Sequence, residues 1–513
     1  MACARSQWTQ FGWDVEASRH NSDEKKISRK NVASLREKWK IEFPNRTSVG
    51  SGSIADGVVY FPANYSIVDP LPATFYAVDR KTGHILWQRQ TEEAGRVISV
   101  TQPVVSRKHG LVYFASSFNE TNPQMYALRM EDGSVAWKTT VDTQPFALIL
   151  GYPGLVEDLL LVPIDSVVVS LIPPPYTTRG AVVALDARTG EIRWRFVTAP
   201  EGYAAGSGVS TGFSFDTKRK LVFIGTGQNY DSSKPSSPYS DSVLALRYDT
   251  TNPNGELVWS RQFTTGDVFN FEEKGADFDV LSTPIVADIL APTMKRQGEK
   301  SVVTCRQLKL ILVSDKKGYA YGLNRKTGEI LWSQFIVPVN PQIGGFKGCN
   351  AQNAYAEGIF YVTGHRPIPP EVSIPDEITI GAVGALSDVY ALDAATGTIL
   401  WKKLGIPGGS VVGMTVANGL LYHATTAGII TIFHAKTGEI VHQFTAPGDD
   451  VFQKIILTSL NVAEGTLFFR NWIRSHSYGL SGVAAIERLF LKRILRYYLL
   501  VPPINNRKRE SRR

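Results

Sequence analysis

The sequence predicts an all-β protein, an eight-bladed β-propeller, and three observations carry that prediction. A motif of the form Ala-x-Asp-x-x-Thr-Gly-x-x-x-Trp recurs along the 513 residues. A short run of strand-forming residues precedes each copy, and these runs number eight along the chain. The spacing from one Trp position to the next is 41 to 73 residues, which suits a four-stranded blade with loops of variable length.

The repeated motif predicts the outer half of each blade. Its clearest copies are FYAVDRKTGHILW (75–87), GAVVALDARTGEIRW (180–194) and VYALDAATGTILW (389–401). Variant copies are MYALRMEDGSVAW (125–137), VLALRYDTTNPNGELVW (243–259), YGLNRKTGEILW (321–332) and ITIFHAKTGEIVH (430–442), in which His442 replaces Trp. In Asp-x-x-Thr-Gly, the Asp side chain caps a turn and the Gly supplies its left-handed φ. The small Ala leaves room for the indole, which brings apolar area and one N–H to a contact between blades.

The second repeated element predicts a buried strand in each blade. Its eight copies are DGVVYFP (56–62), GLVYFAS (110–116), DLLLVPI (158–164), KLVFIGT (220–226), KLILVS (309–314), GIFYVTG (358–364), GLLYHAT (419–425) and GTLFFRN (465–471). Two-residue alternation is weak in these runs, as expected for strands buried on both faces. Trp39, in LREKWKIEF (35–43), has no such run before it. We therefore expect this N-terminal strand to complete the eighth blade and close the ring.

The expected organisation is an N-terminal segment (1–34), the propeller (35–486) and a basic tail (487–513), with blade eight shared by 35–43 and 455–486. The tail carries nine Lys or Arg and two Glu, a net +7 out of the total of +8. The rest of the chain thus has no charge pattern for nucleic acid. The tail is either a disordered extension or an amphipathic helix, and only through it would the protein contact a membrane surface.

Several classes of protein are excluded by the absence of their motifs. Three widely separated cysteines form neither a disulfide framework nor a CxxC metal site, and no HExxH motif occurs. The GVSTG sequence (208–212) precedes a predicted hairpin, so it is not a nucleophile elbow, which requires a helix. The first residues lack the apolar core of a signal peptide.

The eightfold repeat and the opening WTQFGWDVEASRHNSDEKKISRKNVASLREKWKIEF (8–43) resemble the pyrroloquinoline quinone (PQQ) dehydrogenase propellers, in particular the polyvinyl-alcohol-dehydrogenase branch. The resemblance covers roughly residues 8–480. It implies PQQ and Ca²⁺ at one end of the central channel, a small or polymeric alcohol as substrate, and an extracytoplasmic location. Because no CxxCH haem site occurs, it also implies a separate electron acceptor. The alternative is a non-catalytic propeller that binds protein or glycan, because propellers with this repeat also serve as scaffolds.

The resemblance assigns roles to three segments. GADFDVLSTP (275–284) matches the segment with the catalytic base, which implies Asp277, with Asp279 as an alternative. SDKKGYAYGLN (314–324) matches the segment with the cation beside the quinone, which implies Lys316, with Lys317 as an alternative. FIGTGQNY (223–230) matches a calcium-binding strand end. There Gln228 and Asn229 would join Asp277 around the metal, and Gln228 would also contact the cofactor.

Two expected features of the family differ in this chain. No Glu lies between Glu157 and Glu191, where the family has a calcium ligand, and Asp165 is the carboxylate nearest to that position. The Trp on which the quinone stacks is missing from GSGVSTGFSFD (206–216), and Phe213, followed by Phe215, is the nearest aromatic residue. Loss of a stacking platform would weaken cofactor binding by about 1–3 kcal/mol. Both the enzymatic and the scaffold hypotheses therefore remain open.

Overall fold

The computed structural model describes residues 7–42, 50–63, 71–95, 101–118, 121–166, 174–297, 300–340, 347–366, 385–448, 456, 458–471 and 474–480. For 292–297, 300–303 and 474–480 it describes the backbone but not the side chains. The basic tail predicted at 487–513 lies outside the described residues. Within the described part of the chain, we find no helix with the length and apolar character needed to span a bilayer.

Eight sheets make up the fold, and the first six each take four consecutive strands. Their strands are β3 (Ser53–Ala55), β4 (Val58–Ala63), β5 (Leu71–Asp79) and β6 (Ile85–Gly95); β7 (Val104–Ser106), β8 (Leu111–Phe118), β9 (Thr121–Arg129) and β10 (Val135–Thr140); β11 (Gly154–Val156), β12 (Leu159–Ile164), β13 (Ala181–Asp186) and β14 (Ile192–Val197); β15 (Ser214–Asp216), β16 (Leu221–Gly225), β17 (Ser242–Arg247) and β18 (Leu257–Gln262); β19 (Ile285–Gln297), β20 (Lys300–Ser314), β21 (Tyr319–Asn324) and β22 (Ile330–Phe335); and β23 (Ala354–Ala356), β24 (Ile359–Arg366), β25 (Leu386–Asp393) and β26 (Ile399–Pro407).

The last two sheets include strands from the N-terminal part of the chain. The seventh comprises β27 (Thr415–Ala417), β28 (Leu420–Ala424), β29 (Ile429–His434) and β30 (Ile440–Thr445), with β1 (His20–Asn21) parallel to β27. The eighth comprises β31 (Asn461–Ala463), β32 (Thr466–Asn471) and β33 (Arg474–Leu480), with β2 (Leu35–Glu42) as its outer strand. A short 3₁₀ helix, η1 (Val32–Ser34), precedes β2. The predicted pairing of the Trp39 strand with the C-terminal blade is thus present, as Trp39 lies opposite Ser477.

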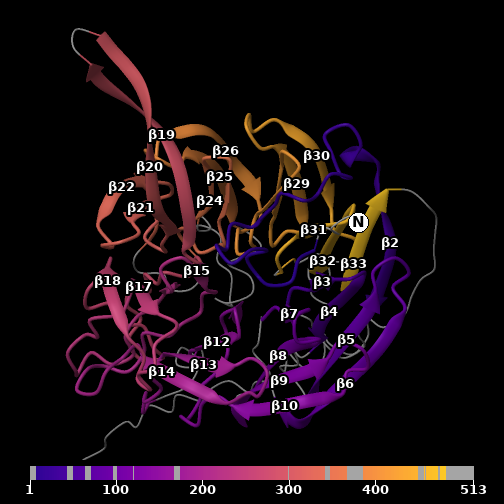
Figure 1. The fold of residues 1–513 in the computed structure, drawn as a ribbon, viewed down its shortest axis with the longest axis vertical. Helices are drawn as coiled ribbons and strands as arrows, with labels where there is room; N and C mark the ends of the chain where they lie inside the picture. The colour runs from indigo at the N-terminus through magenta and orange to yellow at the C-terminus, as the bar shows by residue number, and fades with distance from the viewer. Residues whose placement is uncertain are drawn as a thin grey trace, which may run out of the picture.

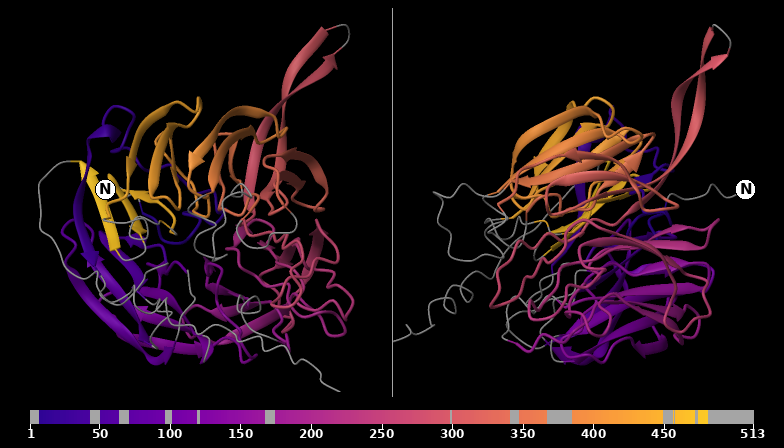
Figure 2. Two further views of the ribbon diagram at one scale, coloured as in Figure 1. Left: turned by 180° about the vertical axis from the view of Figure 1, so that it is seen from behind. Right: turned by 90° about the vertical axis from the view of Figure 1, so that its left-hand side faces the viewer.

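The sheets are arranged as blades around a common axis (Figures 1 and 2). Each pair of successive sheets shares a cluster of buried apolar side chains. The eighth and first sheets do so as well, because Phe468 of β32 packs with Phe61 of β4 and with Trp39. The core is therefore divided into wedges between blades, and the runs of the second repeated element are buried on both faces, which explains their weak alternation in the sequence.

The repeated Trp joins each blade to the next one. Seven indole N–H groups donate to a backbone carbonyl in the β-turn of the following blade, at 2.9–3.1 Å, from Trp39, Trp87, Trp137, Trp194, Trp259, Trp332 and Trp401. In blade two, Gly133 of this turn has φ +70° and lies against the indole of Trp87. A Cβ there would be 2.6 Å from the indole. Ala77, which lies opposite Trp87, belongs to the same sheet as Trp87 and so does not face the next blade. On the side of the next blade, the turn glycine provides the room for the indole.

His442 takes the Trp position at the contact of blades seven and eight. Blade eight has no turn between its third and fourth strands, because β33 is C-terminal and β2 is N-terminal. An indole at 442 would therefore lack the turn carbonyl used by the other seven and the turn glycine against which six of them lie. His442 instead stacks on Phe444, with ring centroids 5.5 Å apart.

The N-terminal segment 8–21, which we call the strap, hydrogen-bonds to all eight blades in turn. Its partners are the innermost strands, at Ile54, Val105, Leu155, Phe215, Val286, Tyr355, Val416 and Val462. Ile54 pairs with Val59 near the start of β4. The other strap contacts also pair near the start of the second strand, except that Val286 in blade five pairs with Ile311, because β20 already starts at Lys300. The strap therefore lies at the end of the axis where the second strands of the other seven blades begin. Arg19 of the strap is buried and donates to Met414 O and Phe11 O.

Strands β19 and β20 extend far beyond the fifth blade. The innermost strands of the other seven blades are three residues long, whereas β19 has 13 residues and pairs with β20 over its whole length. The distal part of this two-stranded arm projects away from the sheets (Figure 2).

Candidate functional site

The second strands of the blades end together at the face opposite the strap, and the candidate site lies there. Asp165 directly follows β12, Gln228 lies three residues beyond β16, and Lys316 lies two residues beyond β20. The segment between β18 and β19 returns to the same place, because Val280 N donates to Thr226 O at 3.1 Å. Equivalent strand ends in neighbouring blades thus bring side chains from distant parts of the sequence together.

The centre of the site is a buried ammonium between two carboxylates. Lys316 Nζ donates to Asp277 Oδ1 at 2.8 Å and to Asp279 Oδ2 at 2.5 Å. All three residues are at least 95% buried. Burial lowers the pKa of Lys316, but Asp277 and Asp279 raise it by more, so the net shift is upward and the ammonium stays charged. The structure therefore brings the predicted base and the predicted cation into direct contact.

Asp279 differs from Asp277 in its surroundings. Burial raises the pKa of Asp279 to about 7, although the nearby Lys316 ammonium counteracts part of this rise. Its other oxygen accepts the backbone N–H of Gln228 at 3.0 Å, and its carbonyl accepts the N–H of Lys316 at 3.1 Å. Asp279 is thus fixed by two strand ends and titrates near neutral pH, which is the range that suits a general base.

Asp277 is held in place through its backbone. It has a φ of +53°, which is uncommon for a residue with a side chain. Its N–H donates to Asp267 Oδ1 at 3.1 Å, and the N–H of Phe278 donates to Asp267 Oδ2 at 2.6 Å. Left-handed backbone at a functional loop costs of order 1–3 kcal/mol and persists only where the surroundings enforce it. The Asp267 carboxylate holds this backbone conformation through its two hydrogen bonds.

Two further charged groups near the triad were not anticipated from sequence. Asp241 is fully buried, and among the described residues neither of its carboxyl oxygens has a hydrogen-bond partner. Burial, followed by the charges of Asp267 and Asp279, raises its pKa well above the usual range. The ammonium of Lys347 is hydrogen-bonded to Ala276 O, and burial lowers its pKa to about 8. Neither residue belongs to a repeat or to a recognisable motif, so no sequence signal marked them.

Asp165 lies on the neighbouring blade and is already satisfied by hydrogen bonds. It accepts from the hydroxyl of Ser210, from Tyr230 Oη at 2.9 Å and from the N–H of Ser166 at 2.6 Å. Gly208 passes so close that a Cβ would be 1.6 Å from Asp165 Oδ1. Ser210 lies in the stretch 206–216, where the resemblance implies a stacking Trp. This region therefore contains the Ser210 hydroxyl, which is hydrogen-bonded to the Asp165 carboxylate.

The remaining predicted residues lie in different environments. The side chain of Asn229 is fully engaged, since its Nδ2 donates to Ser236, Ser240 and Asp267 O while its Oδ1 accepts from Ser237 N. Phe213 packs in the core cluster between blades three and four, near Phe215. Gln228, in contrast, is half-buried directly beside Asp279. Of the predicted set, the structure brings Asp277, Lys316 and Gln228 together, while Asn229 holds a loop and Phe213 fills the core.

The donor set fits a quinone oxygen better than a calcium ion. Lys316 can present a cation to a carbonyl oxygen, because it carries a buried ammonium with three N–H donors. Within the described ranges, no group of three or more His, Cys, Asp or Glu side chains is arranged to hold a metal. The carboxylates of Asp277 and Asp279 both accept from Lys316, and the amide of Asn229 is used elsewhere. The described residues thus do not form the calcium set that the sequence predicts.

The fold and the repeat together define a propeller of the quinoprotein type. The profile of the glucose/ethanol/alcohol dehydrogenase β-propeller domain matches residues 132–342, and that of the outer membrane protein assembly factor BamB matches residues 21–149 and 316–472. The chain belongs to the PQQ-dependent dehydrogenase family of β-propellers.

Relatives of known activity are distant in sequence. A polyvinylalcohol dehydrogenase of Pseudomonas sp. is 24% identical over 469 residues, which cover 85% of this chain and 67% of the relative. The quinohemoprotein alcohol dehydrogenase ADH-IIG of Pseudomonas putida is 25% identical over 371 residues, covering 64% of this chain and 46% of the relative. The solved structure of ADHIIG from Pseudomonas putida HK5 superposes with a TM-score of 0.71 at 18% identity, covering 95% and 82% of the two chains. That superposition supports the fold.

Proposed function

We propose that this protein is a PQQ-dependent oxidoreductase that acts on the CH–OH group of a small or polymeric alcohol. The observation that carries the proposal is the buried triad, in which Lys316 bridges Asp277 and Asp279 at the end of the axis opposite the strap. The family and the alcohol dehydrogenases among its relatives support the same reaction class.

The triad supplies the proton chemistry that alcohol oxidation requires. A hydride leaves the carbinol carbon only as the hydroxyl proton is removed. We assign this proton to the carboxylate pair of Asp277 and Asp279, and the pKa of about 7 makes Asp279 the more effective acceptor near neutral pH. PQQ, when bound, would supply the two-electron acceptor. Lys316 would donate a hydrogen bond to the acceptor oxygen, where negative charge develops, and Gln228 would contact its edge.

The reduced cofactor would pass its electrons to a separate carrier, because the chain has no haem-attachment motif. An extracytoplasmic location belongs to the same proposal and is supported by the match to the outer membrane assembly factor. Calcium is not given a role in the assigned steps, since the described residues do not provide its ligands.

Reconstitution tests the proposal. Titration with PQQ, with and without Ca²⁺, should shift the quinone absorbance and permit dye reduction with primary or secondary alcohols. The rate should rise with pH through about 7 as Asp279 loses its proton. Asp279→Asn should remove this pH dependence and lower kcat by about 10²–10⁴-fold. Asp288→Asn, on the far side of blade five, is the matched control and should retain activity. Absence of any absorbance shift on titration would rule the enzyme out.

A non-catalytic scaffold is the second candidate. It is favoured by the match to the assembly factor and by the serine in the region of the stacking Trp. This function predicts no quinone binding in the same titration, together with capture of a protein or glycan partner that Asp277→Asn leaves unchanged.

A further inference from the structure

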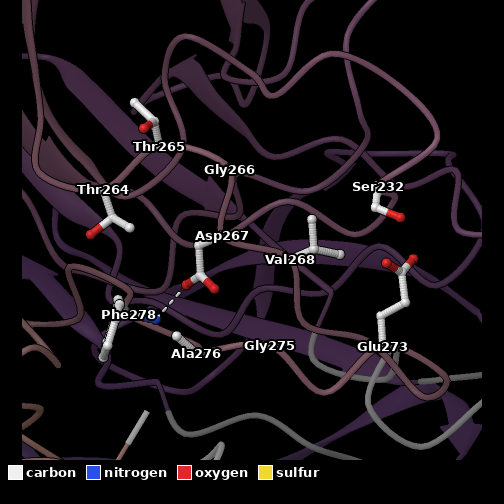
Figure 3. A pocket seen from close by; sticks show the side chains of 10 residues that line it. All are labelled: Ser232, Thr264, Thr265, Gly266, Asp267, Val268, Glu273, Gly275, Ala276 and Phe278. Atoms are coloured by element: carbon white, nitrogen blue, oxygen red, sulfur yellow. Dashed lines mark hydrogen bonds between the residues drawn. The ribbon is translucent and has the colours of Figure 1, made fainter. Parts of the chain in front are cut away.

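A separate pocket of about 390 Å³ lies on the same face of the molecule, in the connection between β18 and β19. Figure 3 shows its lining, which consists of Ser232, Thr264, Thr265, Gly266, Asp267, Val268, Glu273, Gly275, Ala276 and Phe278. None of these residues belongs to the triad. The volume lies within the range of small-ligand sites, which begins at about 300 Å³.

The pocket and the triad share one wall, the segment 275–279. Gly275, Ala276 and Phe278 line the pocket, whereas Asp277 and Asp279 contact Lys316 on the other side. The wall is fixed tightly, because Gly275 N donates to Val268 O at 3.0 Å and a Cβ at Gly275 would be 2.0 Å from that oxygen. Asp267 fastens the wall through the N–H groups of Asp277 and Phe278. The pocket is thus a built feature of the loop.

The charges around the pocket balance each other. Asp267 already accepts two backbone N–H groups, which leaves the exposed Glu273 as the available acidic acceptor. The ammonium groups of Lys347 and Lys317 lie 5.2 and 5.8 Å from the centre of the Phe278 ring. With carboxylates and ammonium groups both at hand, neither a cation nor an anion is selected by net charge.

Apart from these charged groups, hydroxyl groups and one aromatic ring make up most of the side chains that line the pocket. Ser232 and Thr265 are exposed at the rim, and the hydroxyl of Thr264 is buried without a hydrogen-bond partner among the described residues. Phe278 adds a partly exposed apolar surface. Because the Thr264 hydroxyl has no exposed surface, the groups open to a ligand are the rim hydroxyls of Ser232 and Thr265, the Glu273 carboxylate and the Phe278 ring. The matching ligand carries several neutral hydroxyl groups on a short carbon chain.

We propose that this pocket is a binding site for a neutral polyol, separate from the triad but sharing its wall. The hydroxyl groups of the ligand would donate to Glu273 and pair with Ser232 and Thr265, while its C–H face would lie on Phe278. Binding there needs no cofactor, so this proposal stands or fails independently of the oxidoreductase function.

The test uses the full chain without added cofactor and three small flexible probes: sorbitol as the neutral polyol, putrescine as a dication and malonate as a dianion. Calorimetry and saturation-transfer NMR should detect sorbitol binding in preference to both charged probes. Thr265→Trp, which fills the pocket from its rim, should weaken sorbitol binding at least about tenfold.

Thr143→Trp is the matched control. It fills a second pocket of the same volume, about 390 Å³, between β10 and β14, and should leave sorbitol affinity unchanged. Glu273→Ala adds no bulk, removes the acidic acceptor and should also weaken binding, so it tests the site even if the tryptophan variant folds poorly. Tighter binding of putrescine or malonate than of sorbitol overturns the proposal. So does sorbitol binding that is equal in wild type, Thr265→Trp and Glu273→Ala.

Discussion

Lys316 is the residue whose charge makes the candidate site possible. Two carboxylates cannot remain ionised side by side in a buried site unless a cation compensates them. The Lys316 ammonium provides this compensation through two short hydrogen bonds. Its role is therefore structural as well as chemical, and the two roles can be measured separately.

Replacing Lys316 by Gln should destabilise the protein by about 3–5 kcal/mol, because it leaves a buried carboxylate pair without its partner. Chemical denaturation would measure the change in the free energy of unfolding. The neighbouring Lys317→Gln is the control and should change it by less than about 0.5 kcal/mol, since Lys317 is half-buried and makes a long 3.4 Å contact to Phe263 O and a distant one to the Phe278 ring. Equal effects in the two variants would contradict the triad's contribution to stability.

At the residue scale, the sequence predicts the site in part. The resemblance identifies Asp277, Asp279 and Lys316, and they meet because the segment that leads into β19 passes the end of β20 in the same blade. It does not reveal that Asn229 is consumed by loop hydrogen bonds, because those partners lie in segments with no repeat. It also gives no sign of Asp241, whose effect depends on burial. The local pattern places a residue at a strand end, but tertiary packing decides whether the hydrogen-bond donors and acceptors of its side chain are free.

At the scale of the repeated element, the turn glycine carries two functions. It adopts a left-handed backbone, and it provides the flat surface on which the indole of the preceding blade lies. The sequence reveals the first function through the Asp-x-x-Thr-Gly turn. The second is hidden, because the partner indole belongs to the preceding copy of the repeat, which is 41–73 residues away in the chain.

Two glycines of blade two separate these functions. Gly133 and Gly110 both have positive φ, of +70° and +66°, but only Gly133 faces an indole. Gly110→Ala should cost about 1–2 kcal/mol, the price of the left-handed backbone alone. Gly133→Ala adds a Cβ 2.6 Å from Trp87 and should cost at least about 2 kcal/mol more. Denaturant titration of both variants measures the difference, and similar losses would refute the second function.

The number of blades follows from the sequence because the two repeats are local patterns. The long arm of β19 and β20 does not, since its residues resemble any other strand and only its length, 13 and 15 residues, distinguishes it. The replacement of Trp by His442 is explained only once β2 and β33 are seen to form blade eight without a connecting turn. Topology, more than composition, accounts for that departure.

At the scale of the whole molecule, the strap holds the eight blades at one end of the axis. Within it, Asp14 accepts the N–H of Ser18 at 2.7 Å and its hydroxyl as well. Burial raises the pKa of Asp14 to about 7. An acid whose pKa is raised on folding retains a proton that the unfolded chain releases, so its contribution to stability is lost as pH rises from about 4 through 7.

Asp14→Asn removes this loss, because the amide mimics the protonated acid. The free energy of unfolding of the variant, relative to that of wild type, should rise by about 2 kcal/mol between pH 4.5 and pH 8. This is less than the full pKa difference would give, because Asp14 is not completely buried. Free energies of unfolding measured at both pH values give the comparison. A difference between variant and wild type that does not change with pH would show that Asp14 is ionised in the folded strap.

The strap also has a consequence for biosynthesis. Its residues are made before every blade, yet Asn21 binds Val462 and β2 pairs with β33, which are among the last described residues to be made. The end of the strap and β2 must therefore wait for these partners until the eighth blade has been translated. Such a chain can assemble its middle blades while it is still being synthesised, but it can complete the ring only after the eighth blade has emerged.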